Sequence, residues 1–243
     1  MNRTSLYEFT ILVPVYDEED NILRLESELA SFLKTAIVKS CVLFVNDGSR
    51  DNSLELIKGA CQRQEDMFYL SFAGNRGLSA AIKAGIDYAQ SDYIGYIDAD
   101  LQTSPEDFNL LLADAPDYAM VMGIRTGRKD GFVKRASSKI ANGFRRMMTG
   151  DGIEDTGCPL KVLKTEYAKR IPFFTGMHRF MPALILLQDG GTVKQISVRH
   201  FPRTAGESKY HLWNRLVGPF KDCFAYRWMK KRYINYTVAD TDL

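Results

Sequence analysis

Two carboxylates one residue apart end a short apolar segment in the first half of the chain. Asp98 and Asp100 come after the apolar run 93–97, and Gln102 follows two residues later. The run is typical of a buried strand, and the turn residues after it mark the carboxyl end of that strand. Ligands of an open α/β sheet bind outside this end of the strands. Carboxylate and amide oxygens suit Mg²⁺ or Mn²⁺, which substrate phosphates often complete, so the segment suggests a diphosphate substrate.

An Asp-x-Asp segment is weak evidence when it stands alone. Acidic residues also end strands and cap the helices that follow, and Asp98 and Asp100 fit that description equally well. The residues at the other strand ends therefore decide between a metal site and a simple turn.

Three further loops place polar side chains where earlier strands are expected to end. In loop 14–19, Tyr16 offers a ring that can stack on a base, beside carboxylates that can accept hydrogen bonds from a base or ribose. Loop 46–51 combines Asp47 with a glycine turn, and loop 75–77 follows the third expected strand. Turn and cap chemistry explains each loop separately. Four such loops at one edge of a sheet favour a ligand site.

The elements that must position these loops follow from the hydrophobic pattern. Short apolar runs alternate with segments whose apolar residues recur at helical spacing. Such alternation predicts an α/β fold of βαβ units, with a mostly parallel central sheet and helices on both faces. The expected strands are 9–15, 41–46, 68–72, 93–97 and 118–123, and the expected helices are 19–34, 53–64 and 77–90.

Length and composition agree with one large globular domain, or with one domain and an appendage. The chain has 243 residues, of which 45% are hydrophobic, and its formal net charge of +2 does not require a nucleic-acid partner. Its four cysteines lack the spacing of a zinc site or a disulfide framework, so we expect ordinary cytosolic thiols. We expect neither a secretory signal nor a membrane-spanning segment, because no apolar stretch reaches the roughly 18 to 20 residues needed. The absence of G-x-G-x-x-G and of G-x-x-x-x-G-K-[ST] removes the main support for a dinucleotide or P-loop site.

Four motifs in order carry a resemblance to a known family. They are Val-Pro-Val-Tyr-Asp-Glu-Glu at 13–19, Val-Asn-Asp-Gly-Ser-Arg-Asp at 45–51, Asn-Arg-Gly at 75–77 and Asp-Ala-Asp-Leu-Gln at 98–102. Together they resemble the motifs of family-two inverting glycosyltransferases of the GT-A fold. The resemblance covers about residues 9 to 210. It extends to the branch that glycosylates polyprenyl phosphates, such as dolichyl-phosphate mannosyltransferases and their bacterial undecaprenyl-phosphate relatives.

The resemblance implies a role for each residue of the donor side. Asp17 stands where many relatives have Asn, which leaves the carboxylate at Glu18 undisturbed. A Mg²⁺ or Mn²⁺ ion would bridge the diphosphate of a UDP- or GDP-sugar, held by Asp98, Asp100 and Gln102. The nucleotide-sugar site would comprise Pro14, Tyr16, Glu18 and Asp47 around the nucleoside, together with Asp98, Ala99 and Asp100 at the metal.

A basic segment follows the fifth expected strand. Eight Lys and Arg residues lie between positions 125 and 146, against one acidic residue, and an apolar stripe with helical spacing runs through them. This pattern is typical of a membrane-surface element or a phosphate site, although an ordinary helix packed on the sheet by its apolar face would also produce it. By the resemblance, Arg125, Arg135 and Ser138 bind the phosphate of a lipid acceptor.

Three later segments also resemble the family. Asp155, in Asp-Thr-Gly-Cys-Pro, stands at the reaction centre, where we favour positioning over proton abstraction because a phosphate nucleophile is already ionised. His178 either contacts the donor phosphate or caps a helix. In loop 199–210, Arg203, Ser208 and Lys209 are expected to fold over the diphosphate, and Asp155, Arg203 and Lys209 are the expected catalytic residues.

The chain after residue 210 is expected to form a basic amphipathic helical extension, 211–243, of the catalytic domain 1–210. The extension could lie on the cytoplasmic face of the membrane, or pack on the catalytic domain or on a second copy of the chain in a homo-oligomer. The expected activity is inverting transfer of a sugar to a polyprenyl phosphate by a peripheral enzyme at that membrane face. Transfer to a polysaccharide or other non-lipid acceptor is the alternative enzyme. A non-catalytic nucleotide- or lipid-binding protein is the alternative from another class.

Overall fold

The computed structural model describes residues 2–126, 143–202, 212–236 and 238–240, with the side chains of 212–217 and 219 excepted. Arg135, Ser138, Arg203, Ser208 and Lys209 lie outside the described residues, so their predicted roles stay predictions.

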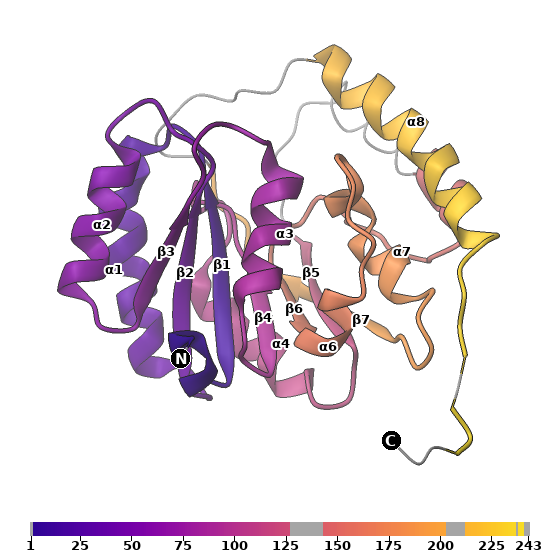
Figure 1. Cartoon of the computed structure of the whole chain (residues 1–243), viewed down its shortest axis with the longest axis horizontal. Helices are drawn as coiled ribbons and strands as arrows, with labels where there is room; N and C mark the ends of the chain where they lie inside the picture. The colour runs from indigo at the N-terminus through magenta and orange to yellow at the C-terminus, as the bar shows by residue number, and fades with distance from the viewer. Residues whose placement is uncertain (1, 127–142, 203–211, 237, 241–243) are drawn as a thin grey trace.

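Seven strands form one sheet in the order β3-β2-β1-β4-β6-β5-β7 (Figure 1). Four of the six pairings are parallel, which confirms the mostly parallel sheet predicted from the sequence. The exception is β6, which runs antiparallel to both of its neighbours, β4 and β5. The strands are β1 (Phe9–Val15), β2 (Ser40–Asn46), β3 (Met67–Ser71), β4 (Tyr93–Tyr96), β5 (Met120–Arg125), β6 (Lys161–Lys164) and β7 (Val193–Val198).

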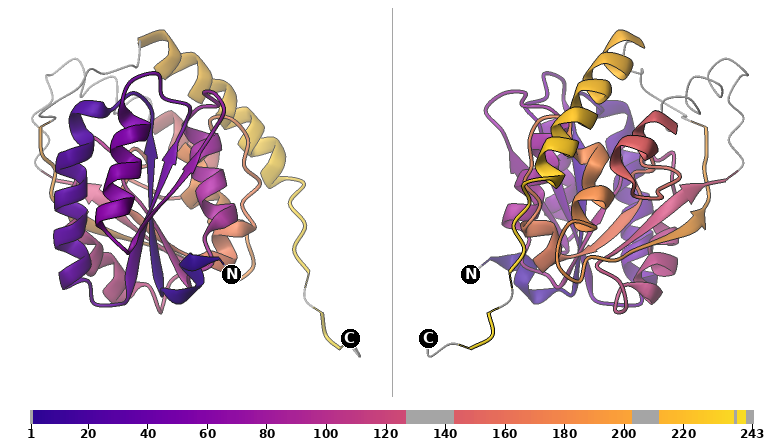
Figure 2. Two further views of the ribbon diagram at one scale, coloured as in Figure 1. Left: turned by 60° about the vertical axis from the view of Figure 1, so that its left-hand side comes forward. Right: turned by 90° about the vertical axis from the view of Figure 1, so that its right-hand side faces the viewer.

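Helices cover both faces of the sheet, and Figures 1 and 2 show this layering from three directions. On one face pack α1 (Glu19–Thr35), α2 (Ser53–Arg63) and α4 (Phe108–Asp114). The other face is covered by α3 (Leu78–Tyr88), α6 (Thr165–Lys169), α7 (Met181–Ile185) and α8 (Leu212–Lys230). Three short 3-10 turns are also described, η1 (Arg3–Leu6), η2 (Pro105–Asp107) and η3 (Met177–Phe180), and residues 143–149 are helical.

The central strands are largely apolar, which fits a sheet whose two faces are both covered. All seven residues of β2 are buried. In α1, Ile22, Leu25, Leu29 and Phe32 recur at helical spacing and are fully buried. Each such side chain contributes about 1.5 to 3 kcal/mol when it leaves water, so this pattern fixes the early α/β units.

The C-terminal helix α8 belongs to the same core as the sheet. Cys223 and Tyr226 are 2% and 1% exposed and lie in the cluster that covers the α3 face. The ring of Tyr226 stacks on Phe180, with ring centroids 5.8 Å apart, and its hydroxyl donates to the carbonyl of Ala183. The predicted division at residue 210 therefore falls between two segments that share one hydrophobic core.

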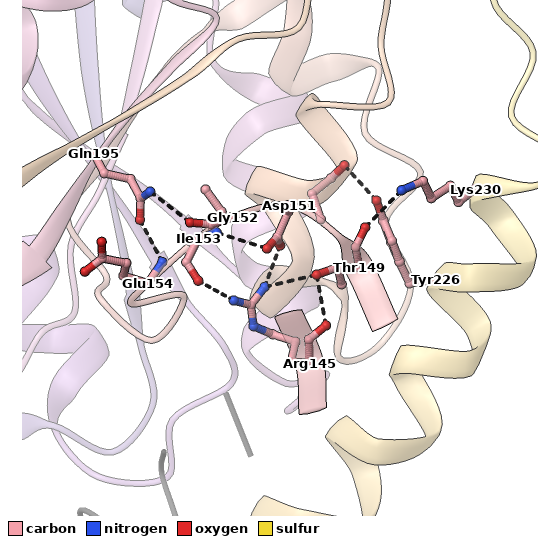
Figure 3. A network of polar contacts seen from close by, with 10 residues as sticks. Arg145, Thr149, Asp151, Gly152, Ile153, Glu154, Gln195, Tyr226 and Lys230 are labelled. Carbon is pink, nitrogen blue, oxygen red and sulfur yellow. Dashed lines mark hydrogen bonds and ion pairs between the residues drawn. The ribbon is translucent and has the colours of Figure 1, made fainter. Parts of the chain in front are cut away.

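A polar network ties α8 to the helical segment 143–149 (Figure 3). The Lys230 ammonium donates to the carbonyl of Thr149 at 3.0 Å. One turn earlier, Arg145 is 7% exposed; its guanidinium forms an ion pair with Asp151 and donates to the Ile153 carbonyl. Arg145 is one of the eight basic residues of segment 125–146. The structure favours the packed-helix interpretation for this residue, because Asp151 and the Ile153 carbonyl hold its charge inside the protein.

Candidate functional site

The polar loops after β1, β2 and β4 meet at the carboxyl edge of the sheet. These strands are adjacent and parallel, with β1 between the other two. Parallel strands end at the same edge, so the loops that begin at Tyr16, Asp47 and Ile97 are brought together. The structure therefore assembles the loops that the sequence singled out separately.

The first two loops are cross-linked by hydrogen bonds. Asp17 accepts from the backbone N–H of Arg50 at 2.6 Å, and its own N–H donates to the Ser49 hydroxyl at 3.0 Å. The N–H of Glu18 donates to the Ser53 hydroxyl at 2.9 Å. Asp17 has a φ of 48°, in the left-handed region that Asn and Asp tolerate best among residues other than glycine. The Asn that the family resemblance implies at this position would suit the same conformation.

The carboxylate of Asp47 accepts hydrogen bonds from the third loop, 75–77. The residue is 3% exposed, and its two carboxylate oxygens accept from the N–H groups of Arg76 and Gly77 at 2.6 and 2.8 Å and from the Asn75 amide at 3.1 Å. Gly48 beside it has a φ of 68°, and a Cβ there would lie 2.4 Å from the backbone of Gly74. Asp47 thus shapes the loop 75–77. That Asp47, Tyr16, Glu18 and Pro14 contact a nucleoside stays a prediction.

Asp98 and Asp100 stand where β4 gives way to its loop. Both residues are partly buried, with Ala99 buried between them. The Tyr96 hydroxyl donates to Asp98, and the N–H of Gln102 donates to Asp100 at 3.1 Å. Burial and then the neighbouring Asp100 raise the pKa of Asp98 to about 6. The two carboxylates are therefore close enough to repel each other, which favours a cation between or beside them.

The backbone of this loop is strained. Leu101 has a φ of 50° although it is not glycine, and its side chain is 4% exposed. A left-handed conformation costs an L-residue roughly 1 to 2 kcal/mol, and such strain concentrates at functional sites. The Gln102 carbonyl connects this loop to the segment after β7. It accepts a hydrogen bond from the N–H of Phe201 at 2.9 Å and lies 3.0 Å from Nδ1 of His200. The sequence analysis did not connect His200 with this loop.

The carboxylate pair fits a Mg²⁺ or Mn²⁺ ion that its substrate completes. Asp98 and Asp100 offer hard oxygen ligands at the mouth of the site. Within the described part of the chain there is no group of three or more His, Cys, Asp or Glu side chains that could hold a metal. An ion here would consequently need oxygens from a bound diphosphate and from water, as Mg²⁺ in phosphate-binding enzymes commonly does.

Arg125 and Asp155 form a bidentate pair near the carboxylates. Nε and Nη2 of Arg125 each donate to an oxygen of Asp155 at 2.8 Å, and the two side chains are 14% and 12% exposed. Arg125 ends β5, and Asp155 lies in the loop that leads into β6. A Cβ on Gly157 would lie 2.9 Å from Nη2 of Arg125, so the guanidinium rests against a residue without a side chain. The structure brings together two residues that the sequence analysis assigned to separate roles.

His178 packs against the start of α3. Its Nδ1 lies 2.7 Å from the hydroxyl of Ser79, and that hydroxyl also accepts from the N–H of Gly176 at 3.0 Å. Burial first, and then the cations Arg179 and Lys161, lower the pKa of His178 to about 3. His178 is therefore neutral near pH 7. Its predicted contact with a donor phosphate stays a prediction.

Lys161 is a charged residue of the site that the sequence analysis missed. It begins β6, is 2% exposed, and its ammonium donates to the carbonyl of Cys158. Burial lowers its pKa, while Cys158, Asp98 and Asp155 act in the opposite direction. The sequence shows a lysine four residues after Gly157, but only the sheet order places it opposite Tyr96 of β4 and Met122 of β5.

The sequence of the chain matches a known family. Residues 10–180 match the sequence model of the family described as Glycosyl transferase family 2. The chain belongs to glycosyl transferase family 2. The predicted family-two resemblance is thereby confirmed.

Two curated relatives of this family-two chain are named for sugar transfer to polyprenyl phosphates. The chain is 31% identical over 205 residues to an undecaprenyl-phosphate 4-deoxy-4-formamido-L-arabinose transferase of Edwardsiella ictaluri, covering 84% of this chain and 63% of the relative. It is 29% identical over 208 residues to a dodecaprenyl-phosphate galacturonate synthase of Rhizobium johnstonii, covering 84% and 62%. The chain thus spans less than two thirds of the length of these curated relatives.

Solved structures confirm the GT-A fold of this family-two domain. Glucosyl-3-phosphoglycerate synthase from Mycobacterium tuberculosis, in complex with Mn²⁺, UDP-glucose and phosphoglyceric acid, superposes with a TM-score of 0.66 at 14% identity, covering 94% of this chain and 81% of that one. A mannosyltransferase from Pyrobaculum calidifontis, in complex with GDP-Man and Mn²⁺, superposes with a TM-score of 0.62 at 14% identity, covering 96% and 66%.

Proposed function

We propose that this protein transfers a sugar from a UDP- or GDP-sugar to a polyprenyl phosphate, with inversion at the anomeric carbon. One structural observation carries the proposal. The cationic Arg125, held by Asp155, lies at the same site as the carboxylates Asp98 and Asp100. Such a site can take two phosphate groups at once, one through a metal ion and one through a guanidinium. Relatives named as undecaprenyl- and dodecaprenyl-phosphate sugar transferases support the lipid acceptor.

The donor half of the site would hold a nucleoside diphosphate. Asp98 and Asp100, with Gln102, would bind a Mg²⁺ or Mn²⁺ ion, and Mn²⁺ accompanies nucleotide sugars in two structural neighbours. The ion, when bound, stabilises the negative charge that develops on the leaving diphosphate. Tyr16 and Glu18 would hold the nucleoside on the loop that Asp17, Ser49 and Ser53 brace. Arg203, Ser208 and Lys209 would add donors to the diphosphate.

The acceptor half would hold the phosphate nucleophile in line with the anomeric carbon. Arg125 would bind the lipid phosphate, together with Arg135 and Ser138. A phosphate oxygen would form the new bond to the anomeric carbon as the bond to the diphosphate breaks on the opposite face, which inverts the configuration. The phosphate is largely ionised near neutral pH, so the reaction needs no general base at this oxygen. Asp155, already bonded to Arg125, would then orient the cation that binds the acceptor.

The outer face of α8 supports a peripheral site of action on a membrane. The outward aromatic stripe comprises Phe224 and Trp228, one turn apart on α8 and 53% and 59% exposed, whereas Phe220 stacks on Phe144 with ring centroids 4.9 Å apart. An outward aromatic stripe is unusual for a helix surrounded only by water.

Basic residues flank this aromatic stripe. Residues 220–232 carry five Lys or Arg residues and one Asp. Within the described part of the chain no helix is long and apolar enough to span a bilayer. We infer that the stripe inserts at the inner face of the cell membrane, where anionic lipids attract the cations.

The experiment that tests the reaction uses the full chain. The protein is incubated with undecaprenyl or dolichyl phosphate, Mg²⁺ or Mn²⁺, and a panel of UDP- and GDP-sugars, and the lipid product is identified by mass. A metal-dependent glycosyl-phosphoryl lipid is expected with one donor and is lost in Asp100→Asn. Donor hydrolysis without lipid product would overturn the acceptor assignment and revive transfer to another acceptor. Binding of nucleotide or lipid without turnover would favour a non-catalytic protein.

A further inference from the structure

The position of Lys161 follows from the one strand that runs against the others. β6 pairs antiparallel with β4 and β5, so its first residue lies where those two strands end. Lys161 stands directly opposite Tyr96 on β4 and Met122 on β5. A parallel strand would have placed its first residue at the other edge of the sheet. The reversal of β6 therefore puts a lysine beneath the candidate site.

Lys161 contacts both halves of that site. On one side, its ammonium donates to the Cys158 carbonyl, and the N–H of Cys158 donates to the Asp155 carbonyl at 3.2 Å. On the other side, the ammonium lies 5.5 Å from the ring centroid of Tyr96, whose hydroxyl donates to Asp98. The Lys161 side chain therefore links two parts of the site. One is the turn that contains Asp155, the partner of Arg125, and the other is Tyr96, which donates to the predicted metal ligand Asp98.

The surroundings of Lys161 are charged on both sides. Cys158, then Asp98 and Asp155, act to raise the pKa of Lys161 against the effect of burial, and Arg125 is the second basic group nearby. The basic side chains Lys161 and Arg125 and the acidic side chains Asp98 and Asp155 therefore share one poorly hydrated region, with Asp100 beside Asp98. Each charge there stabilises its opposite, because their interaction is screened less than in water.

A purely structural role does not explain this lysine. Burying an ammonium costs several kcal/mol, and an apolar residue of similar volume is often equally stable at such a position. If Lys161 served only to donate a hydrogen bond to the Cys158 carbonyl, a neutral donor would be sufficient. Lys164, on the same strand, illustrates the ordinary case: it is partly exposed and donates to the Pro116 carbonyl at 2.8 Å.

We propose that Lys161 is a positioning residue whose buried charge holds Asp98 and the 155–158 turn in one fixed arrangement, so that the donor and acceptor phosphates meet at the right distance. The proposal rests on the proposed function for the identity of the two phosphates. Its structural part concerns only the coupling of Asp98 to the 155–158 turn. That part can be tested without a lipid acceptor.

Three variants separate charge from hydrogen bonding. Lys161→Gln keeps a donor for the Cys158 carbonyl and removes the charge, whereas Lys161→Arg keeps both. Lys164→Gln is the matched control on the same strand. We expect Lys161→Gln to unfold at nearly the wild-type temperature. Its affinity for Mn²⁺, measured from the EPR signal of the free ion, should be about 10-fold weaker, because a residue that supports a metal ligand is lost. Lys161→Arg should return most of the affinity, and Lys164→Gln should match the wild type.

The same variants are then compared in turnover. Lys161→Gln should lower kcat for the lipid acceptor by about 10- to 100-fold. Wild-type Mn²⁺ affinity and kcat in Lys161→Gln would overturn the proposal, and so would tighter Mn²⁺ binding, because the charge would then only repel the ion. If Lys161→Gln does not fold, Lys161→Met takes its place under the same criteria. If the wild type makes no lipid product, the proposed function falls while the Mn²⁺ comparison still decides the role of Lys161.

Discussion

The guanidinium of Arg125 holds the carboxylate of Asp155 through two parallel hydrogen bonds of 2.8 Å, donated by Nε and Nη2. A third bond reaches the same carboxylate from the Arg125 N–H at 3.3 Å. Thirty residues separate the two partners, which meet because β6 lies beside β5. This arrangement supports the proposal that Asp155 orients a cation, because both of its carboxylate oxygens already accept hydrogen bonds from Arg125.

Replacing Asp155 should destabilise the protein more than replacing a surface partner. Asp155→Asn removes the charge that faces Arg125 and leaves the guanidinium poorly paired, so we expect the free energy of unfolding to fall by up to about 3 to 5 kcal/mol. Urea denaturation measures the change. Asp114→Asn is the matched control, because Asp114 pairs with Lys194 at 2.8 Å on the surface, where a loss below about 1 kcal/mol is expected. Equal losses in the two variants would contradict a buried structural pair at Arg125.

A methyl group at position 157 should displace Arg125 without unfolding the protein. The Cβ of Gly157→Ala would lie 2.9 Å from Nη2, so the guanidinium must move. We expect KM for the lipid phosphate to rise by about 10-fold, as for a weakened charge-assisted contact, with the donor KM unchanged. Gly59→Ala, in the middle of α2, is the control, since its Cβ meets only the end of the exposed Arg63 side chain. A rise in the donor KM instead would place Arg125 on the donor side.

His178 should stay neutral through the physiological range. The folded state holds its pKa near 3, below the ordinary value of 6.5, so only the unfolded chain takes up this proton as the pH falls between those values. Stability should therefore decline from pH 6.5 towards pH 3. This decline should be shallower in His178→Gln, measured by urea denaturation at each pH. A ring proton shift of His178 that titrates near pH 6.5 in NMR spectra would refute the assignment.

The same contact predicts the tautomer of His178. The Ser79 hydroxyl accepts from Gly176, and within the described residues its hydrogen has Nδ1 of His178 as its acceptor. Nε2 should therefore carry the ring proton. Two-bond nitrogen–proton NMR correlations report the tautomer directly, and Ser79→Ala should change the pattern of His178 only. An Nδ1–H pattern in the wild type would show that the hydroxyl accepts both bonds.

Membrane association should depend on the outward face of α8. Phe224→Ser with Trp228→Ser removes two exposed aromatic rings from that face. We expect sedimentation with anionic phospholipid vesicles to weaken by at least about tenfold, and high salt to weaken the wild type as well. Leu23→Ser is the control, because Leu23 is 60% exposed on α1, which covers the opposite face of the sheet. Unchanged vesicle binding with loss of a dimer would assign the stripe to a second copy of the chain.

The early α/β units were predictable because burial on both faces leaves a strong local pattern. The strands β1 and β2 and the helices α1 and α2 lie within about a residue of their predicted bounds, and each polar loop was recognised where its strand ended. The later strands carry weaker patterns. β6 is four residues long and has a lysine at each end, so its local sequence does not distinguish a strand from a surface loop.

The sequence by itself determined the alternation of strands and helices, the family motifs and the carboxylates at the end of β4. These depend on hydrophobic period and on residues close together in the chain. Tertiary structure alone decided that Arg125 pairs with Asp155, that Arg145 is buried against Asp151, and that β6 places Lys161 opposite Tyr96 of β4. Those contacts depend on the order and direction of the strands, which local sequence does not encode. They also depend on burial, because a buried charge needs a partner inside the protein.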